Sequence, residues 1–214
     1  MNFRALICFF FLLNPLTALS DWTGVIVKLE DTDTSWLVRD QSQESSVNRL
    51  SLEMEEKTAA ELRVGISIGQ VSIRTKGISG IDRIEKFEGN YFGLYLRQPV
   101  HLNNYLSFEG SLGYRLHTGM GQIESDADEI EWHETNLMLS IGLYIADIRV
   151  SPFVQWKKVD GDVSGEEGRN VFETDEARSQ GLMLDYFIDP FSYIRLQFSE
   201  GGNESLQISF AKVY

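Results

Sequence analysis

Apolar and polar side chains alternate along most of this chain, and the alternation is clearest in residues 91–116. The first arm of that stretch places Phe92, Leu94 and Leu96 on one face, and the second arm continues the same apolar face. The opposite face carries glycine, serine, glutamate, arginine and histidine. A period of two residues is typical of a β-strand, so the two arms, separated by a break at residues 99–104, predict a β-hairpin.

Eight further segments are apolar and β-branched or show the same alternation, and with the hairpin they predict ten strands. These segments are residues 22–30, 47–55, 61–69, 136–144, 148–157, 182–188, 193–199 and 206–214. The nearest alternative is eight strands, if the first segment or one of the pair around Asn203 is misassigned. Pro152 has no amide hydrogen to donate, so we expect an irregular point in its strand.

The predicted strands share one apolar face, and their other face is polar. A transmembrane β-barrel shows this pattern, because lipid surrounds it and its lumen is polar. An unpaired strand edge in hydrocarbon would leave backbone groups without hydrogen-bond partners, so the sheet must close on itself. We therefore predict an all-β fold, a closed antiparallel transmembrane barrel of about ten strands.

Long and short connections alternate through most of the chain. Polar loops are predicted at residues 31–45, 74–86, 117–131 and 160–176, and tight turns at residues 56–59, 99–104, 146–147 and 189–190. An extension of the first strand through residues 36–38 is the alternative within the first loop. Outer-membrane barrels have short periplasmic turns and longer extracellular loops, and an even strand number would place both termini in the periplasm. Aromatic residues beside these connections predict two interfacial girdles, with Trp132 and Trp156 in one and Tyr105, Phe191, Tyr193 and Tyr214 in the other.

The first twenty residues have the features of a cleaved secretory signal peptide. Arg4 precedes an apolar block at residues 5–13, and a small-residue pattern ends at Ser20. The block is shorter than the roughly 20 residues that a membrane-spanning helix needs. We expect the mature chain to form one domain, residues 21–214. Cys8 would be removed with the signal, leaving no disulfide and no catalytic thiol.

Charge narrows the possible partners. Only Arg4 among the charged residues lies in the predicted signal, so the mature chain would carry 18 basic and 32 acidic side chains, a net charge of 18 − 32 = −14. This acidity argues against nucleic acid as a partner. The mean hydropathy of −0.18 would suit a soluble protein, but strands with a single apolar face give a weak hydropathy signal, so it does not contradict a membrane barrel.

The chain ends in the pattern Leu206, Ile208, Phe210 and Tyr214, with an aromatic last residue. This pattern resembles the C-terminal signal by which the assembly machinery recognises outer-membrane barrels of Gram-negative bacteria. Lys212 departs from it, since that position is usually apolar or aromatic. The predicted architecture is similar to the small barrels of the OmpA and OmpX type. The resemblance implies an outer-membrane location, with the barrel assembly machinery, outer-membrane lipid and lipopolysaccharide as partners and a monomeric state.

The predicted inner faces carry charges of both signs. They include Glu61, Arg63, Arg97, Glu109, Arg115, Arg149, Lys157 and Arg195. A barrel of eight to ten strands is barely wide enough for its own side chains, so these groups should pair across the lumen. We expect a lumen network of Arg63, Arg97, Glu109, Arg115, Arg149 and Arg195, with Arg97, Glu109 and Arg115 at its centre. A narrow conducting pore is the alternative.

Charged residues in the predicted loops suggest surface contacts. Arg74, Lys76, Arg83 and Lys86 lie where the second long loop would meet the membrane, and they could pair with the phosphates of lipopolysaccharide. The acidic loops could bind divalent cations, but the spacing of Asp126, Asp128 and Glu129 lacks the full EF-hand pattern, so a solvated surface is favoured and no metal site is predicted.

The three histidines provide only a weak case for catalysis. Omptin proteases, which are ten-stranded barrels, use two acidic residues with an Asp-x-His pair at the extracellular rim. Asp31 and Asp33, with Glu131 and His133, match those spacings, but Glu131 replaces the aspartate and the chain is shorter. His101 and His117 have no serine signature beside them, and no cofactor is expected. The sequence therefore favours a structural or surface-interaction role, with a narrow channel second and an omptin-like rim protease third.

Overall fold

The computed structural model describes residues 23–58, 61–76, 78, 84–121, 129–165 and 168–214, and its regular elements are all β-strands. They are β1 (Thr23–Val38), β2 (Gln41–Lys57), β3 (Arg63–Lys76), β4 (Ile84–His101), β5 (Leu106–Gly121), β6 (Glu129–Ile145), β7 (Ile148–Gly165), β8 (Gly168–Thr174), β9 (Arg178–Asp189), β10 (Ser192–Gly201) and β11 (Asn203–Val213). Among these described residues, no helix is long and apolar enough to cross a membrane. The predicted signal, residues 1–20, lies outside the described residues.

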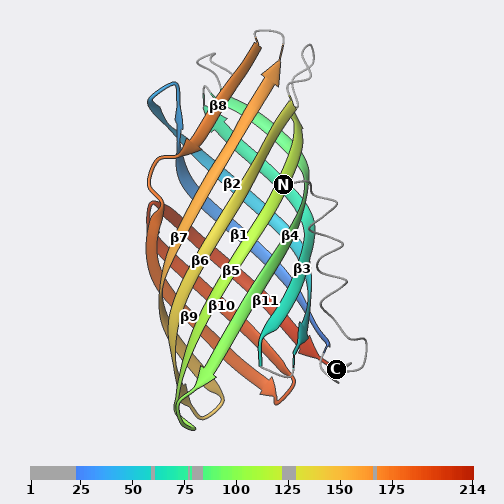
Figure 1. Ribbon diagram of the computed structural model, residues 1–214, viewed down its shortest axis with the longest axis vertical. Coiled ribbons are helices and arrows are strands. Elements are labelled where there is room, and N and C mark those ends of the chain that lie inside the picture. Colours follow the sequence, from blue (N-terminus) through green and yellow to red (C-terminus); the bar gives the residue numbers. More distant parts are fainter. Residues whose placement is uncertain (1–22, 59–60, 77, 79–83, 122–128, 166–167) are drawn as a thin grey trace.

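Ten of the strands form a closed antiparallel barrel (Figure 1), which confirms the predicted fold class and strand number. Strands β1 to β7 pair in chain order, β7 pairs with β9, β9 with β10, and β10 with β11. Pairing of β11 with β1, from Gly24 opposite Val213 to Thr34 opposite Asn203, closes the sheet. No strand edge is left open over that length, as a hydrocarbon surrounding requires.

The remaining strand, β8, fills the wall at one end of the barrel only. β9, β10 and β11 have 12, 10 and 11 residues, whereas β1 to β7 have 14 to 18. Where these short strands stop, β8 takes their place, pairing with β7 from Asp160 and with β1 at Trp36–Val38. The molecule thus has a ten-strand part, which holds Thr23 and Val213, and a narrower eight-strand part at the opposite end (Figure 1).

Outward apolar side chains surround the ten-strand part and form what we call the belt. Its members are exposed large apolar residues: Val27, Leu29, Leu50, Leu52, Met54, Ile66, Ile68, Phe92, Leu94, Phe108, Leu112, Tyr114, Leu116, Leu137, Ile141, Leu143, Ile148, Trp156, Leu182, Tyr186, Ile188, Ile194, Phe198, Leu206, Ile208 and Phe210. They occupy alternate positions of their strands, as the sequence pattern predicted. The belt is the surface that lipid would cover.

Two of the predicted long loops, residues 31–45 and 160–176, are wrong over most of their length, because the strands continue beyond the belt. Residues 31–45 form the end of β1, a tight turn and the start of β2. Arg39 and Asp40 occupy that turn with φ of 50° and 62°, as a two-residue type I′ hairpin requires. Residues 160–176 contain the end of β7 and β8.

The other two predicted loops, residues 74–86 and 117–131, are corrected at their ends only, because residues 77, 79–83 and 122–128, with Asp126 and Asp128, lie outside the described residues. β3 continues to Lys76 and β4 begins at Ile84, while β5 continues to Gly121 and β6 begins at Glu129. Alternation persists in all these extensions with its polarity reversed: Trp36 and Val38 point inward and are buried, while Asp33 points outward. The outer face of these extensions is mostly polar, although Ile84, Met120 and Val171 are exposed there, as expected of a wall that water rather than lipid would surround.

The short connections lie mostly where they were predicted. Ala146 and Asp147 form a tight turn, with Ala146 at φ 53°. The turn predicted at residues 99–104 lies between β4 and β5, at residues 102–105, and residues 59–60 of the first turn lie outside the described residues. Pro152 marks the expected irregularity, since the register of β6 with β7 is interrupted between Ser140 and Leu143.

Candidate functional site

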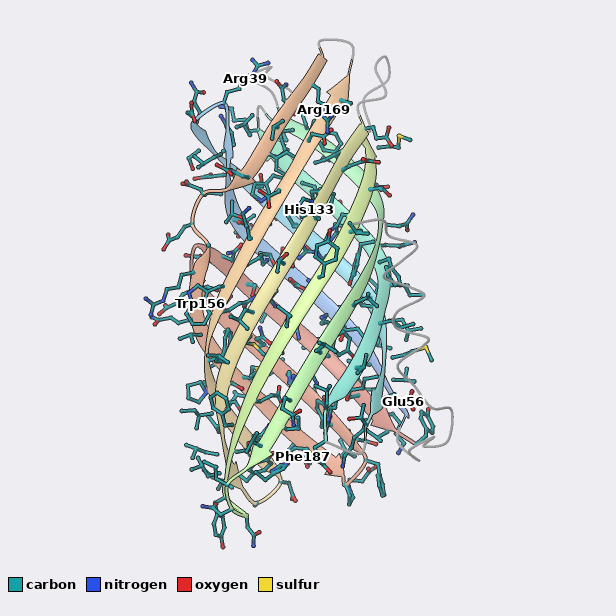
Figure 2. The ribbon with its side chains drawn as sticks, viewed as in Figure 1. Arg39, Glu56, His133, Trp156, Arg169 and Phe187 are labelled. Atoms are coloured by element: carbon teal, nitrogen blue, oxygen red, sulfur yellow. The ribbon has the colours of Figure 1, made fainter. Side chains whose placement is uncertain are left out.

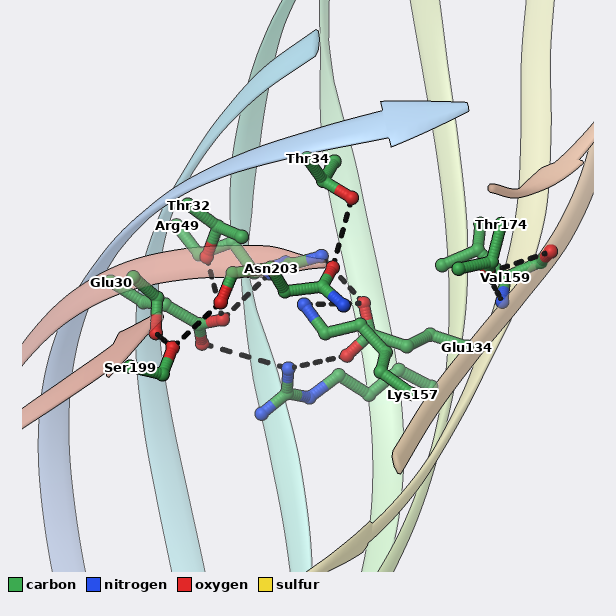
Figure 3. A network of polar contacts seen from close by, with 12 residues as sticks. Glu30, Thr32, Thr34, Arg49, Glu134, Lys157, Val159, Thr174, Ser199 and Asn203 are labelled. Carbon is green, nitrogen blue, oxygen red and sulfur yellow. Dashed lines mark hydrogen bonds and ion pairs between the residues drawn. The ribbon is translucent and has the colours of Figure 1, made fainter. Parts of the chain in front are cut away.

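Two clusters of ion pairs fill the lumen of the ten-strand part, on the strand faces opposite the belt. The upper cluster, nearer the eight-strand part, consists of Lys28, Glu30, Arg49, Glu53, Arg115, Glu134 and Lys157. Arg49 lies 2.8 Å from a carboxylate oxygen of Glu30 and 2.8 Å from one of Glu134, and so joins β1 to β6 across the lumen (Figure 3). Lys28 forms an ion pair with Glu53.

Glu134 is the most heavily shared carboxylate of the upper cluster. It accepts hydrogen bonds from Arg49 at 2.8 Å and from Arg115 at 3.0 Å, and Lys157 Nζ lies 3.9 Å away. Its side chain is 2% exposed. Figure 3 shows Glu134 and Lys157 projecting toward the group formed by Glu30 and Arg49. One buried carboxylate therefore compensates three cations.

The lower cluster occupies the other half of the same lumen and consists of Glu55, Arg63, Arg97, Glu109, Arg149, Asp185 and Arg195. Asp185 accepts hydrogen bonds from Arg149 and Arg195, at 2.6 Å each. Arg97 lies between two carboxylates, 3.5 Å from Glu55 and 3.6 Å from Glu109. Every carboxylate in this cluster faces two guanidinium groups, and the seven residues come from seven strands, which the ion pairs hold together across the lumen.

Tyrosine rings support several of these guanidinium groups. Arg97, Arg115, Arg149 and Arg195 each lie 5.4–5.8 Å from the ring centroid of Tyr95, Tyr91, Tyr144 and Tyr193 respectively, within the range of cation–π attraction. Two of these rings need glycine opposite them: a Cβ at Gly65 would lie 2.1 Å from the Tyr95 ring, and one at Gly69 2.6 Å from the Tyr91 ring.

The eight-strand part is closed by an apolar plug, which the sequence analysis did not predict. The plug consists of Trp36, Val38, Val47, Val71, Ile73, Ile78, Phe87, Tyr91, Ile130, Trp132, Val159, Val163 and Phe172, all buried. It begins directly beyond the upper cluster, since Trp132 lies two residues from Glu134 on the inner face of β6. Trp36 stacks on Phe172 of β8 at 4.7 Å, so the inserted strand completes the plug.

Three aromatic residues that the sequence placed in the interfacial girdles or in a loop have their side chains in the barrel interior. Trp132 is 3% exposed and is not part of an interfacial girdle. Tyr193 points inward beside Arg195. His117 is no loop residue: it is 1% exposed on β5, stacked on Trp132 at 4.1 Å, and neither ring nitrogen has a hydrogen-bond partner among the described residues. For His117 the prediction failed because it treated residues 117–131 as loop, whereas the inward position of Tyr193 agrees with the alternation of the strand predicted at residues 193–199.

The structure places all six predicted lumen residues on the inner face, and Glu61 elsewhere. Glu61 lies in the turn before β3, with its side chain 55% exposed, and pairs with Lys57 at 2.7 Å. The hydrogen bond from the Lys57 ammonium lowers the pKa of Glu61 below its usual value. The positive φ of Glu61, 64°, turns the chain there and interrupts the alternation that had suggested an inward position.

Sequence reasoning missed most of the lumen carboxylates. Glu30, Glu53, Glu55, Glu134 and Asp185 provide five of the six in the two clusters. The signal was present in the sequence: Glu134 is one alternation step before the strand predicted at residues 136–144, and Asp185 lies within the strand predicted at residues 182–188, between outward Leu184 and Tyr186. Extending the first alternation by one step and reading the inner face of the second would have found both.

The residues considered for catalysis do not assemble. Asp31 and Asp33 project outward from β1, whereas Glu131 and His133 project outward from β6, which pairs with β5 and β7 and not with β1. His133, labelled on the wall of the barrel in Figure 2, lies 3.5 Å from Asp160 of β7. His101 is the last residue of β4. Among the described residues, no group of three or more histidine, cysteine, aspartate or glutamate side chains could hold a metal ion.

The basic residues considered for lipopolysaccharide lie on the outer wall beyond the belt. Arg74 and Lys76 of β3 and Lys86 of β4 are exposed, and Arg74 lies directly opposite Lys86 in the strand register. Arg83 lies outside the described residues. The two aromatic residues of the predicted assembly signal are also outward and exposed, with Phe210 in the belt and Tyr214 after the end of β11.

Comparison with known proteins identifies the architecture. No protein-family model and no curated protein matches the chain. Among solved structures, the translocator domain of the autotransporter NalP from Neisseria meningitidis is 9% identical, with a TM-score of 0.50 over 98% of this chain and 93% of that one. An outer-membrane channel from Pseudomonas putida F1 is also 9% identical, with a TM-score of 0.50 over 94% and 100% of the two chains. This chain therefore has the barrel fold of outer-membrane proteins.

Proposed function

We propose that this chain is a non-conducting barrel of the bacterial outer membrane with a structural and surface-interaction role. The belt supports the membrane location, because so many exposed apolar side chains around a closed barrel suit a lipid environment. The main support for a non-conducting barrel is that the lumen is closed twice, by the two ion-pair clusters and by the apolar plug.

The plug is the stronger of the two closures. An eight-strand barrel has an interior just wide enough for its own side chains. Here that interior holds Trp36, Trp132 and Phe172, each 3% exposed or less. An ion would have to displace these rings as well as the ion pairs below them, so the lumen provides no continuous aqueous path.

The part of the outer wall beyond the belt favours a partner with basic groups. Among the described residues there, the exposed acidic side chains are Asp31, Asp33, Asp40, Glu44, Glu88, Glu129, Glu131, Glu173, Asp175, Glu176, Glu200 and Glu204, and the exposed basic ones are Arg39, Arg74, Lys76, Lys86, Lys158, Arg169 and Arg178. Figure 2 places Arg39 and Arg169 near the end of this part, opposite Glu56 and Phe187. The excess of carboxylates would attract cationic surfaces at a distance.

Planar-bilayer recording tests the proposal. Wild-type protein, refolded in detergent and shown to be a closed barrel by its change in electrophoretic mobility on boiling, is expected to insert without discrete conductance steps. A porin inserted into the same membranes provides the positive control. Discrete steps from the wild-type protein would contradict a non-conducting barrel and favour the narrow channel instead.

Lipopolysaccharide is the lipid partner that we propose for the outer wall. Arg74 and Lys86 lie directly opposite each other, and like charges in that position repel unless an anion lies between them. Neither side chain forms an ion pair with any other residue that the structure describes. A lipopolysaccharide phosphate between the two cations would remove the repulsion and form charge-assisted hydrogen bonds.

Charge reversal at this pair tests the lipid contact. The double variant Arg74→Glu, Lys86→Glu is expected to retain several-fold less lipopolysaccharide than the wild type when purified from outer membranes, measured as bound phosphate per protein. Lys158→Glu, on the outward face of β7, is the matched control and should retain the wild-type amount. Equal retention by all three proteins would refute the contact.

A further inference from the structure

A cavity of about 100 Å³ lies in the lumen between the upper and lower clusters. Its charged lining consists of five cationic and three anionic side chains: Lys28, Arg97, Arg115, Lys157 and Arg195 against Glu30, Glu53 and Glu134. Apart from Arg195, the lining residues of β10 and β11 are uncharged, and Gln197, Gln207 and Ser209 contribute amide and hydroxyl groups. The cavity therefore has an excess of cationic side chains and further hydrogen-bond donors on its β10 and β11 side.

The surplus of cations extends to both clusters as a whole. The upper cluster has four cations, Lys28, Arg49, Arg115 and Lys157, and three carboxylates, Glu30, Glu53 and Glu134. The lower cluster has four cations, Arg63, Arg97, Arg149 and Arg195, and three carboxylates, Glu55, Glu109 and Asp185. Within the described clusters, eight cations thus face six carboxylates, an excess of two positive charges.

Lys157 is the least compensated of these cations. Its Nζ lies 3.9 Å from Glu134, beyond hydrogen-bond distance, and Glu134 already accepts shorter bonds from Arg49 and Arg115. The Lys157 side chain is only 6% exposed and lines the cavity. A buried cation without a close partner is costly, since neither water nor a counter-charge replaces its hydration shell.

We propose that this cavity binds one small inorganic anion, such as chloride, beside Lys157. The anion would supply the missing counter-charge of the upper cluster and accept hydrogen bonds from the Lys157 ammonium and the polar groups of β10 and β11. The cavity volume suits a small ion and not a bulky organic anion such as gluconate. This site is independent of the proposed function, because a non-conducting barrel and a channel could each contain it.

Heat-induced unfolding at constant ionic strength tests the site. Protein refolded in detergent with sodium gluconate is titrated with sodium chloride replacing gluconate, and the temperature at which the boiled-form mobility appears is measured. For the wild type this temperature should rise by several degrees and then saturate, because a ligand that binds only the folded state stabilises it. The same temperature at all chloride fractions would overturn the proposal.

Two variants separate the site from a general salt effect. Lys157→Met leaves three cations and three carboxylates in the upper cluster, so it should be at least as stable as the wild type in gluconate and should not respond to chloride. Lys158→Met is the matched control, since Lys158 is the outward neighbour with its side chain 68% exposed, and it should keep the full response. A response retained by Lys157→Met would refute the site.

A third variant keeps the test decisive if Lys157→Met fails to fold. Asn136 lies directly opposite Lys157 in the register of β6 and β7 and lines the cavity. Asn136→Asp should place a fixed carboxylate where the anion would bind. The variant is expected to be as stable in gluconate as the wild type in chloride and to be insensitive to chloride. A chloride response of wild-type size in this variant would also refute the site.

Discussion

Replacing Glu134 by glutamine is expected to destabilise the barrel by about 3–5 kcal/mol, the usual cost of breaking a buried ion pair by removing one partner. The side chain is 2% exposed and lies 2.8 Å from Arg49 and 3.0 Å from Arg115, with Lys157 at 3.9 Å. Glutamine keeps the shape but removes the charge, so the variant leaves Arg49, Arg115 and Lys157 without their shared carboxylate. Urea-induced unfolding of protein refolded in lipid vesicles would measure the loss.

Glu131→Gln is the matched control for this variant. Glu131 lies on the same strand, three residues earlier, with its side chain outward and exposed. Its replacement should change the free energy of unfolding by no more than about 0.5 kcal/mol, as for most surface positions. If the two variants were equally stable, the lumen network would not contribute to folding as the contacts indicate.

Trp132→Ala is expected to cost about 3–5 kcal/mol, typical of removing a large buried aromatic side chain. The indole stacks on His117 at 4.1 Å, with an angle of 7° between the rings, and lies 6.3 Å from Trp36. It also packs on Gly161 of β7, where a Cβ would lie 2.4 Å from that of Trp132. The alanine variant would lose these contacts and leave a cavity in the plug, and the same unfolding titration would measure the effect.

Trp156, a tryptophan of the belt, provides the matched control for Trp132→Ala. Trp156→Ala removes the same side chain from an outward position that is 39% exposed, so it should cost clearly less than Trp132→Ala. Since the ion-pair clusters remain in place, neither variant should produce conductance steps. A smaller loss for Trp132→Ala than for Trp156→Ala would contradict the description of the eight-strand part as a packed core.

The sequence predicted the ten-strand part well because one physical rule applies throughout it. Lipid outside and polar groups inside produce a simple alternation, as in Leu106 to Leu116 of β5, and counting those runs gives the strand number. Beyond the belt the rule reverses, since water lies outside and tight packing inside. Trp36 and Val38 were therefore placed in a polar loop, with an extension of the first strand only as the alternative, and β8 was not predicted at all.

The site was less predictable than the fold, because its contacts join distant parts of the chain. Arginine residues such as Arg97 and Arg115 could be placed on the inner face from alternation alone. Their partners depend on which strands face each other across the lumen: Arg49 and Glu134 are separated by 85 residues and lie on strands that are not paired. Periodicity gives the direction of a side chain but not the residue opposite it.

The insertion of β8 also constrains the order in which the chain can fold. β1 shares 11 register pairs with β11 but only three with β8, so its edge stays largely open until the last strand arrives. A chain that lacked β9 to β11 could not close as a smaller barrel, because three pairs leave most of β1 unprotected. Closure must therefore wait until β11 has been synthesised, and chains that end before β9 would be expected to keep the edge of β1 exposed.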